Sequence, residues 1–226
     1  TLGNDPWNPD KEILMVSLGW RDSDGVLLAA TVDLGHPLGP FREDHLSWME
    51  VTQKFKEYLA SPKPKIGSFL DFEFLWSVLK LEQEPNGVLW DIGLMHHLFD
   101  QERKNPGHSL KSLVWVYSPY GGYERPKDEY LKEHGLSMGE LEKADFDIVA
   151  DYCGKDSYVT YFLYEVFLDL LREKDLEAFY QQHTAEHIKG IAQIRLNGCK
   201  LDLKKASRLE KEYESEIADA EAELNC

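Results

Sequence analysis

A tyrosine and an aspartate, Tyr152 and Asp156, stand four residues apart in the segment Tyr-Cys-Gly-Lys-Asp. On a helix this spacing places both side chains on one face. The carboxylate can then bind a divalent metal ion, while the phenol one turn away hydrogen-bonds a water molecule held by that ion. The same spacing is also typical of a buried aromatic residue beside a solvated charge, so the pair alone does not define a site.

Asp71 is a second candidate, because it stands where the short apolar stretch of Ile66 to Leu70 changes into the helical pattern of Phe72 to Leu81. Open α/β sheets gather ligands at the ends of their strands, which favours a metal ligand at this junction. The alternative is an N-cap, in which the Asp71 carboxylate accepts hydrogen bonds from the first amides of the following helix. Both interpretations remain open.

The elements that would position these residues alternate between strands and helices. Residues 12–20 and 25–33 read as two strands joined by a polar turn, which predicts a β-hairpin. Strands alternating with helices favour an α/β sheet covered by helices, and the hairpin makes that sheet mixed. The other predicted elements are helices at 45–59, 92–99, 144–172 and 202–224, the last one exposed, and a short strand at 87–90.

The composition of the chain argues against several classes of protein. The net charge of -16 argues against indiscriminate nucleic-acid binding, because nonspecific affinity comes mainly from Lys and Arg. No apolar run approaches the ~20 residues that a membrane span needs, and the first residues have no signal-peptide pattern. Three separated cysteines, Cys153, Cys199 and Cys226, suggest neither a disulfide framework nor a thiolate zinc site. We therefore expect a soluble protein of the cytoplasm with no membrane partner.

The order and spacing of several segments resemble the 3′→5′ proofreading exonuclease domain of family A (DNA polymerase I type) DNA polymerases. This domain belongs to the DEDD superfamily and carries Tyr in its third motif. The similar segments are 1–7, following the first motif; 70–75, the second motif; 90–92 and 107–113, an intervening strand and helix; 152–156, the third motif; and 191–202, the opening of the polymerase domain, where a helix ends at Gly198 and Asp202 starts the next.

The resemblance implies an α/β fold with an RNase H-like mixed sheet flanked by helices, its first strand apparently missing, followed by a helical segment. It also implies two domains. Residues 1–173 would form an N-terminally incomplete exonuclease domain, and residues 174–226 the helical start of the polymerase domain.

The activity implied by the resemblance is hydrolysis of the 3′-terminal phosphodiester of DNA with two ions of Mg²⁺ or Mn²⁺. By position, Asp71 and Asp156 would hold the metals, Tyr152 would orient the attacking water, and Thr1 and Leu2 would lie near the terminal nucleotide. The expected partners are a single-stranded 3′ end and a polymerase domain, in cis or as a separate chain. A bacterial or phage-infected cell is the expected setting.

Two features depart from the family pattern. The first-motif Asp-x-Glu would stand immediately before Thr1, on the central strand, and Gly67 and Ser68 stand where the family has an Asn before the second-motif Asp. The chain as given is therefore expected to be weakly active or inactive. A non-enzymatic alternative follows, in which a degenerate exonuclease domain serves as a scaffold for the polymerase.

A remote alternative is a zinc peptidase, since His183, Glu186 and His187 match an H-x-x-E-H pattern with two histidines on one helical face. Only a short Lys- and Glu-rich tail follows to supply a third ligand. The neighbouring His96 and His97 point in different directions on a helix, which favours packing or surface positions over a metal site.

Overall fold

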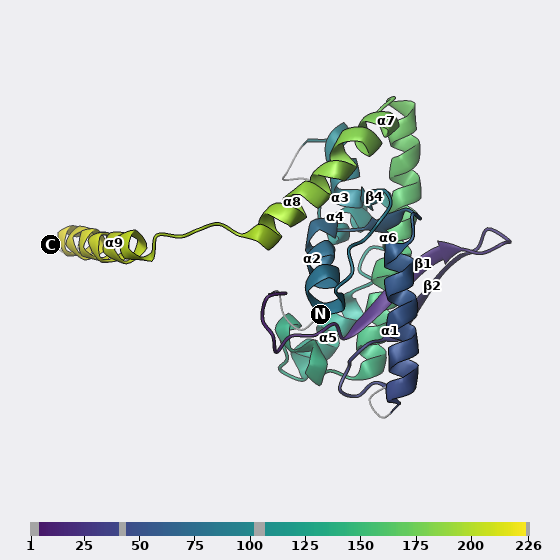
Figure 1. The fold of residues 1–226 in the computed structure, drawn as a ribbon, viewed down its shortest axis with the longest axis horizontal. Helices are drawn as coiled ribbons and strands as arrows, with labels where there is room; N and C mark the ends of the chain where they lie inside the picture. Colours follow the sequence, from purple (N-terminus) through teal and green to yellow (C-terminus); the bar gives the residue numbers. More distant parts are fainter. Residues whose placement is uncertain (1–4, 41–43, 102–106, 225–226) are drawn as a thin grey trace. The chain divides into compact units, whose positions relative to one another are not determined.

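The computed structural model describes residues 5–40, 44–101 and 107–224 (Figure 1). Contacts divide the chain into two compact units, Thr1–Ala192 and Gln193–Cys226. In chain order the elements are β1 (Met15–Arg21), β2 (Leu27–Asp33), α1 (His45–Ala60), β3 (Lys65–Gly67), α2 (Leu70–Leu81), β4 (Leu89–Asp91), α3 (Ile92–Phe99), α4 (Leu110–Tyr117), α5 (Arg125–Glu133), the 3₁₀ helix η2 (Met138–Lys143), α6 (Phe146–Glu173), α7 (Glu177–Phe179), the π-helix η3 (Tyr180–Thr184), α8 (Ala185–Asn197) and α9 (Leu203–Leu224).

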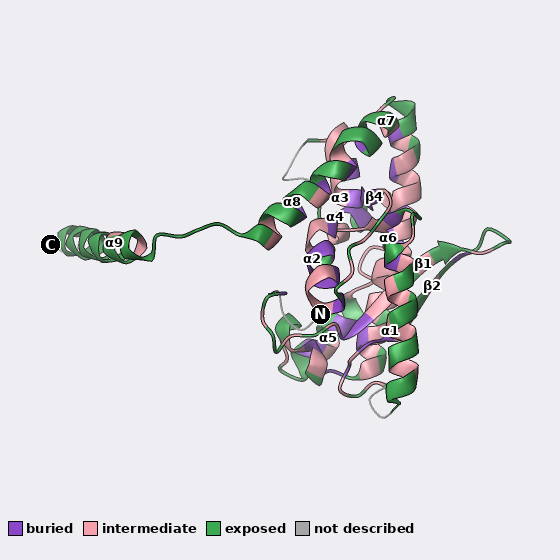
Figure 2. Cartoon of the chain, viewed as in Figure 1, coloured by how far each residue is buried: buried purple, intermediate pink, exposed green. Residues whose placement is uncertain are grey.

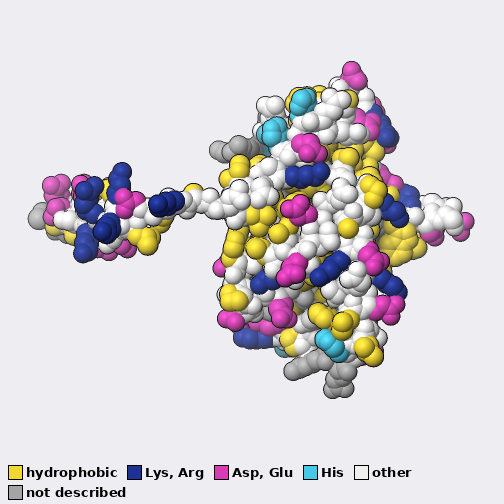
Figure 3. Space-filling view, in the orientation of Figure 1, with side chains coloured by type: hydrophobic (Ala, Val, Ile, Leu, Met, Phe, Trp, Pro, Cys, Tyr) yellow, Lys and Arg dark blue, Asp and Glu magenta, His cyan; other side chains and the backbone are white. Residues whose placement is uncertain are grey.

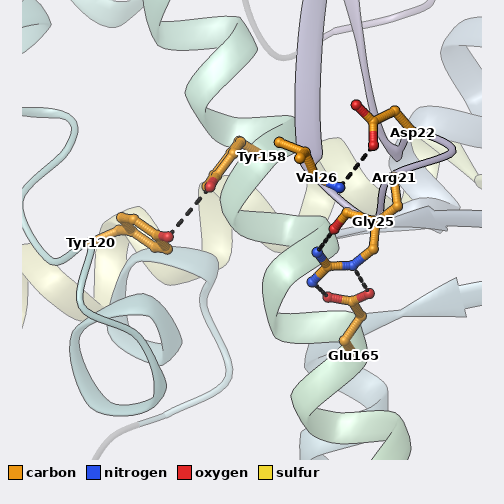
Figure 4. Close-up of polar contacts among 7 residues, drawn as sticks. All are labelled: Arg21, Asp22, Gly25, Val26, Tyr120, Tyr158 and Glu165. Atoms are coloured by element: carbon orange, nitrogen blue, oxygen red, sulfur yellow. Dashed lines mark hydrogen bonds and ion pairs between the residues drawn. The ribbon is translucent and has the colours of Figure 1, made fainter.

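The predicted hairpin is confirmed: β1 and β2 pair antiparallel along their whole length. Its turn forms because the Asp22 carboxylate accepts hydrogen bonds from the amides of Asp24, at 3.0 Å, and Val26, at 2.8 Å. The Arg21 guanidinium donates to the Gly25 carbonyl at 2.6 Å and forms a bidentate ion pair with Glu165 of α6 (Figure 4). The far end of the hairpin is thereby fixed to α6.

The α/β class is confirmed, but the sheet differs from the prediction of one mixed sheet. The described strands form two separate two-stranded sheets, antiparallel β1–β2 and parallel β3–β4. The reason is that, among the described residues, no strand lies between β1 and β3 to join them. Both sheets pack against α6, which contacts β1, β2 and β3.

Helix α6 runs through the centre of the first unit, as its apolar and aromatic sequence predicts. Its buried residues Leu163, Phe167 and Leu171 pack with α3 and α4 in the main hydrophobic cluster. Tyr180 belongs to the same cluster: it is fully buried, stacks on Trp90 at 4.7 Å, and accepts a hydrogen bond from the Asp91 amide. Residues beyond Glu173 thus complete the core of this unit, whereas the domain limit at 173 and 174 remains a prediction.

The second unit contains α9, whose residues are almost all exposed, as predicted (Figure 2). Gly198, with a φ of 65°, follows the end of α8, and the Asp202 carboxylate accepts a hydrogen bond from the Lys205 amide at 3.0 Å. These are the positions of a C-cap glycine and an N-cap aspartate. Among the described residues, no helix is long and apolar enough to cross a membrane.

Candidate active site

A cavity of about 490 Å³ in the first unit contains the chemistry-bearing residues. Among the polar side chains that line it are a glutamate of α2, Glu73, and a tyrosine and an aspartate of α6, Tyr152 and Asp156. The remaining walls come mainly from apolar residues of β1, α1, β3 and α2. A concave, largely apolar site with a few converging polar groups is the usual form of a ligand or active site.

Helix α2 presents Glu73 to this cavity because Leu70, Phe74 and Leu81 anchor its apolar side in the core. Asp71 and Glu73 both lie in its first turn, where the helix dipole favours negative charge. Residues two apart on a helix do not share a face. Accordingly, Glu73 lines the cavity, whereas Asp71 is outside the described set of lining residues.

The N-cap interpretation of Asp71 is not what the structure shows, because the helix begins at Leu70 with Phe69 at the N-cap position. The capping carboxylate comes instead from Asp91, twenty-one residues away in sequence, which accepts a hydrogen bond from the Leu70 amide at 2.8 Å. Phe69 takes a left-handed φ of 58°, an uncommon conformation for a bulky residue. Asp91 also caps α3; burial raises the pKa of its carboxyl group, and the charge of nearby Asp71 adds to this.

Tyr152 and Asp156 lie one turn apart on α6, as their spacing predicts. The Asp156 carboxylate accepts a hydrogen bond from the phenol of Tyr123 at 2.5 Å, and the phenol of Tyr152 also acts to lower the pKa of this carboxyl group. The two tyrosine rings stack with a centroid distance of 6.2 Å, and the buried ammonium of Lys127 lies 4.6 Å from the centre of the Tyr152 ring. Three side chains from two segments, Tyr123, Lys127 and Tyr152, thus surround this carboxylate.

Both carboxyl groups of the cavity, Asp156 and Glu73, have a raised pKa. Burial raises the pKa of Asp156, although the two phenols and the charges of Lys111 and Lys127 act to lower it. Glu73 is open to water inside the cavity, yet the surrounding protein desolvates it; this burial, and then the charge of Asp156, raise the pKa of Glu73. Two carboxylates in one cavity resist being charged together, and a bound cation would relieve that cost.

Burial and the Asp156 charge also raise the pKa of both Tyr123 and Tyr152, burial being the larger cause. Both phenols therefore stay protonated at neutral pH and act as hydrogen-bond donors. Tyr152 can orient a water molecule or a phosphate oxygen, but it cannot accept a proton from one as a phenolate base.

The donor set fits a divalent metal only in part. Glu73 and Asp156 supply carboxylate oxygens, the ligands that Mg²⁺ and Mn²⁺ prefer. However, within the part of the chain that the structure describes, no group of three or more His, Cys, Asp or Glu side chains could hold a metal ion. The cavity thus carries part of a ligand set, and a two-metal site would need oxygen ligands from outside these residues.

The remaining predicted site residues are Thr1, Leu2 and the three residues of the zinc-peptidase pattern. Thr1 and Leu2 lie outside the described residues. His183, Glu186 and His187 are exposed on η3 and α8, and Glu186 pairs with Lys189 at 3.3 Å, so the structure lends no support to a zinc peptidase.

A histidine cluster lies elsewhere in the first unit. His96 is fully buried, and its Nδ1 atom lies 2.8 Å from His108 Nδ1; His97 Nδ1 lies 3.3 Å from His108 Nε2. The buried position of His96 agrees with the expectation that this residue packs in the core or lies at the surface and binds no metal ion. Because the rings contact one another, this arrangement is a hydrogen-bonded chain rather than a set of ligands around one point.

The sequence interpretation missed three residues of the candidate site. The sequence pattern favours Asp71 as the metal ligand, although Glu73 lies in the same helical turn. Tyr123 lies within a Pro-, Gly- and Tyr-rich stretch that reads as a surface loop, and Lys127 directly follows it; no local pattern indicates their contact with α6. The sequence carries one signal for Glu73. A helical period places residues 70, 73, 74, 77 and 81 on one side of the helix, and Glu73 is the acidic residue among them.

Comparison with known proteins gives one relevant similarity. The chain matches no protein-family model. Over 154 residues it is 25% identical to a DNA polymerase of Bacillus phage SP01, in a match that covers 68% of this chain and 16% of that polymerase. The chain thus spans a small part of its relative's length. It contains a region related in sequence to a DNA polymerase.

Proposed function

We propose that this chain is the 3′→5′ exonuclease module of a family A DNA polymerase, with an RNase H-like fold, acting on single-stranded 3′ ends of DNA. The observation that carries the proposal is the convergence of Asp156, Tyr152 and Glu73 on one cavity in a chain similar to a DNA polymerase. A DNA polymerase relative indicates an enzyme of the nucleotidyltransferase or nuclease kind.

The surface supports a substrate that contacts the protein over a short length. Acidic and basic side chains are interspersed over the face shown in Figure 3, and the net charge is -16. Long nonspecific contact with a phosphate backbone needs an excess of Lys and Arg. A frayed terminus that enters a cavity needs few cations, and Lys111 and Lys127 already act electrostatically on Asp156 from nearby.

The roles within the site follow from its geometry. Asp156, held by the phenol of Tyr123, would bind a divalent ion, and Tyr152 would orient the attacking water by donating a hydrogen bond. Glu73 is our candidate for the second carboxylate, and Asp71 remains the candidate from sequence. Bound Mg²⁺ or Mn²⁺ would supply a water nucleophile and stabilise charge on the leaving oxygen. The polymerase domain, in the same polypeptide or a separate one, would present the primer end.

One observation favours a second candidate, a catalytically degenerate domain that acts as a scaffold for the polymerase. Glu73 and Asp156, the carboxylates that the described residues supply to the cavity, are fewer than a two-metal site needs, and Gly67 and Ser68 stand where the family has an Asn. In that case the carboxylates of the cavity would be dispensable for polymerase function, while the packing of α6 would not.

The test is digestion of a 5′-labelled primer with a mismatched 3′ end, using the natural polypeptide that contains this chain, with Mg²⁺ or Mn²⁺. We expect stepwise shortening from the 3′ end. Asp156→Asn should reduce its rate at least about 100-fold, as loss of a metal ligand does, and the matched control Asp147→Asn, at an exposed position of α6, should leave it unchanged. Comparison of Asp71→Asn with Glu73→Gln identifies the second ligand. A wild-type protein with no activity would support the scaffold function instead.

A further inference from the structure

Helix α5 packs against α6, and its buried residues are Lys127 and Leu131, which lie one turn apart on the same face. Leu131 packs with Leu141 and Val149 in an apolar cluster. Lys127 shares this face, and only 2% of its side chain is exposed. A lysine is almost never fully buried unless its charge has a partner. The contacts of its ammonium group should therefore explain why it is there.

The ion pair of Lys127 does not require its burial. The ammonium pairs with the carboxylate of the neighbouring Asp128, whose side chain is 52% exposed. A lysine has a long flexible stem and could meet this partner with its charged head in water. The other contacts lie inward: the ammonium donates to the Met138 sulfur at 3.0 Å and lies 4.6 Å from the centre of the Tyr152 ring. Because a thioether is a weak acceptor, the ring is the more important of these two contacts.

The Tyr152 ring is held by one short segment of the chain, residues 123–127. The ring of Tyr123 stacks on it with an interplanar angle of 9°. The Lys127 ammonium lies within the distance of about 6 Å at which a cation is attracted to the face of an aromatic ring. A tyrosine on a helix has more than one staggered rotamer available, and these contacts restrict that choice. The segment thereby limits the directions in which the Tyr152 phenol can point.

Lys127 can influence the cavity only indirectly. Tyr152 is among the described lining residues, whereas Lys127 is not. The lysine therefore acts through the tyrosine it contacts, and through its charge, which also reaches Asp156 one turn farther along α6. A group that orients a water molecule contributes only while it points in the productive direction, so the residue that holds it affects the rate.

We propose that Lys127 is a positioning residue: its buried ammonium holds the Tyr152 ring so that the phenol points at the attacking water. This inference rests on the proposed function for the identity of the reaction, whereas the hold on the ring exists without substrate. The alternative is a purely structural lysine, whose methylene stem fills space between α5 and α6. Replacement by methionine separates the two, because methionine is also unbranched and apolar along its length but has no charge.

The test replaces Lys127 in the natural polypeptide that contains this chain. Lys127→Met removes the charge, Lys127→Arg keeps a cation for the ring, and Lys132→Met, at an exposed position of α5, is the matched control. The proteins are labelled with 3-fluorotyrosine, and the Tyr152 signals are identified by their loss in Tyr152→Phe. In fluorine NMR, a ring that is held gives a separate signal for each of its edges, whereas a rapidly flipping ring gives one averaged signal.

Lys127→Met should be no less stable than wild type, because replacing a buried charge by an apolar side chain of similar volume is often neutral or stabilising. Its Tyr152 ring should nevertheless flip at least about tenfold faster, which is the effect expected from loss of a desolvated cation–π contact. Lys127→Arg and Lys132→Met should keep the wild-type flip rate. An unchanged flip rate in Lys127→Met would overturn the proposal. A Lys127→Met protein that unfolds, or a Lys127→Arg protein whose ring flips as fast as in Lys127→Met, would overturn it in favour of the structural lysine.

Kinetics on the mismatched primer test the effect on the reaction. Lys127→Met should lower kcat about tenfold and change KM by less than about twofold, because the phenol acts on the water and not on DNA binding. A rise in KM with an unchanged kcat would overturn the positioning role in favour of a role in substrate binding. A wild-type protein that shortens no primer would contradict the proposed nuclease function, whereas the flip rates would still decide whether Lys127 holds Tyr152.

Discussion

The hydroxyl of Tyr123 donates a 2.5 Å hydrogen bond to the Asp156 carboxylate, joining the loop before α5 to the middle of α6. The bond reaches a carboxylate whose pKa is already raised by burial. It therefore holds Asp156 in place and favours its charged form, both of which a metal ligand needs.

Tyr123→Phe should destabilise the protein by about 1–2 kcal/mol, because it removes a hydrogen bond to a charged group that is only partly shielded from solvent. It should also raise the pKa of Asp156 further, since the phenol no longer stabilises the carboxylate. Urea unfolding measures the first effect, and NMR titration of the Asp156 side chain the second. Tyr213→Phe, on the exposed α9, is the matched control. Equal stability of the two variants would show that the bond contributes nothing.

Asp91 should be a major determinant of stability, because one carboxylate caps two helices. It accepts hydrogen bonds from Leu70 of α2 at 2.8 Å and from Gly93 of α3 at 2.9 Å. Loss of a helix cap costs roughly 0.5–2 kcal/mol, so Asp91→Ala, which removes two caps, should lower the free energy of unfolding by about 1–4 kcal/mol. Asp169→Ala, an exposed change on α6, should have little effect. A loss below about 1 kcal/mol for Asp91→Ala would contradict the double cap.

The histidine cluster predicts a loss of stability in mild acid. Burial, and then the positive charge that His108 carries when protonated, lower the pKa of His96 in the folded state. Below the unfolded value of about 6.5, the unfolded chain binds a proton that the folded chain resists. The contribution of His96 to the free energy of unfolding should therefore be constant above pH 6.5. Below pH 6.5 it should make the protein less stable as the pH decreases.

The variant His96→Gln isolates this effect from the carboxylates of the cavity. The difference in unfolding free energy between wild type and variant should change between pH 7 and pH 5, by at most about 1.4 kcal/mol per pH unit. Replacement of the exposed His187 by Gln serves as the control. A difference that is independent of pH would show that His96 binds its proton equally in both states.

The two described cysteines should differ strongly in reactivity. Burial raises the pKa of Cys153 to about 11, whereas Cys199 is exposed. Because the thiolate is the reactive form, only about one Cys153 thiol in a thousand is reactive at pH 8. A thiol-disulfide reagent followed by mass spectrometry should therefore modify Cys199 first. Faster reaction of Cys153 would contradict the burial of its side chain.

The sequence predicts those elements whose patterns are local. The hairpin follows from two apolar runs and a polar turn, and α1 and α6 follow from helical spacing, so all three were predicted close to their observed bounds. The two-sheet arrangement could not be predicted in this way, because strand pairing depends on neighbours distant in sequence. For the same reason the sequence does not show that Asp91, rather than Asp71, caps α2.

The part of the candidate site that lies on α6 could be predicted from the sequence. Tyr152 and Asp156 share a helical face because their spacing is that of one turn, and the structure places both at the cavity. Selection of Glu73 over Asp71 needs the direction in which α2 packs, which is set by the burial of Leu70 and Phe74. The contact of Tyr123 with Asp156 spans 33 residues and has no local signal.

The central claim is that Glu73 and Asp156 face one another across the same cavity and together attract a cation. NMR titration of the Glu73 carboxyl carbon, in wild type and in Asp156→Asn, tests it most directly. Removal of the Asp156 charge should lower the raised pKa of Glu73, since that charge contributes to raising it. An identical Glu73 pKa in both proteins would show that the two carboxylates do not share a site.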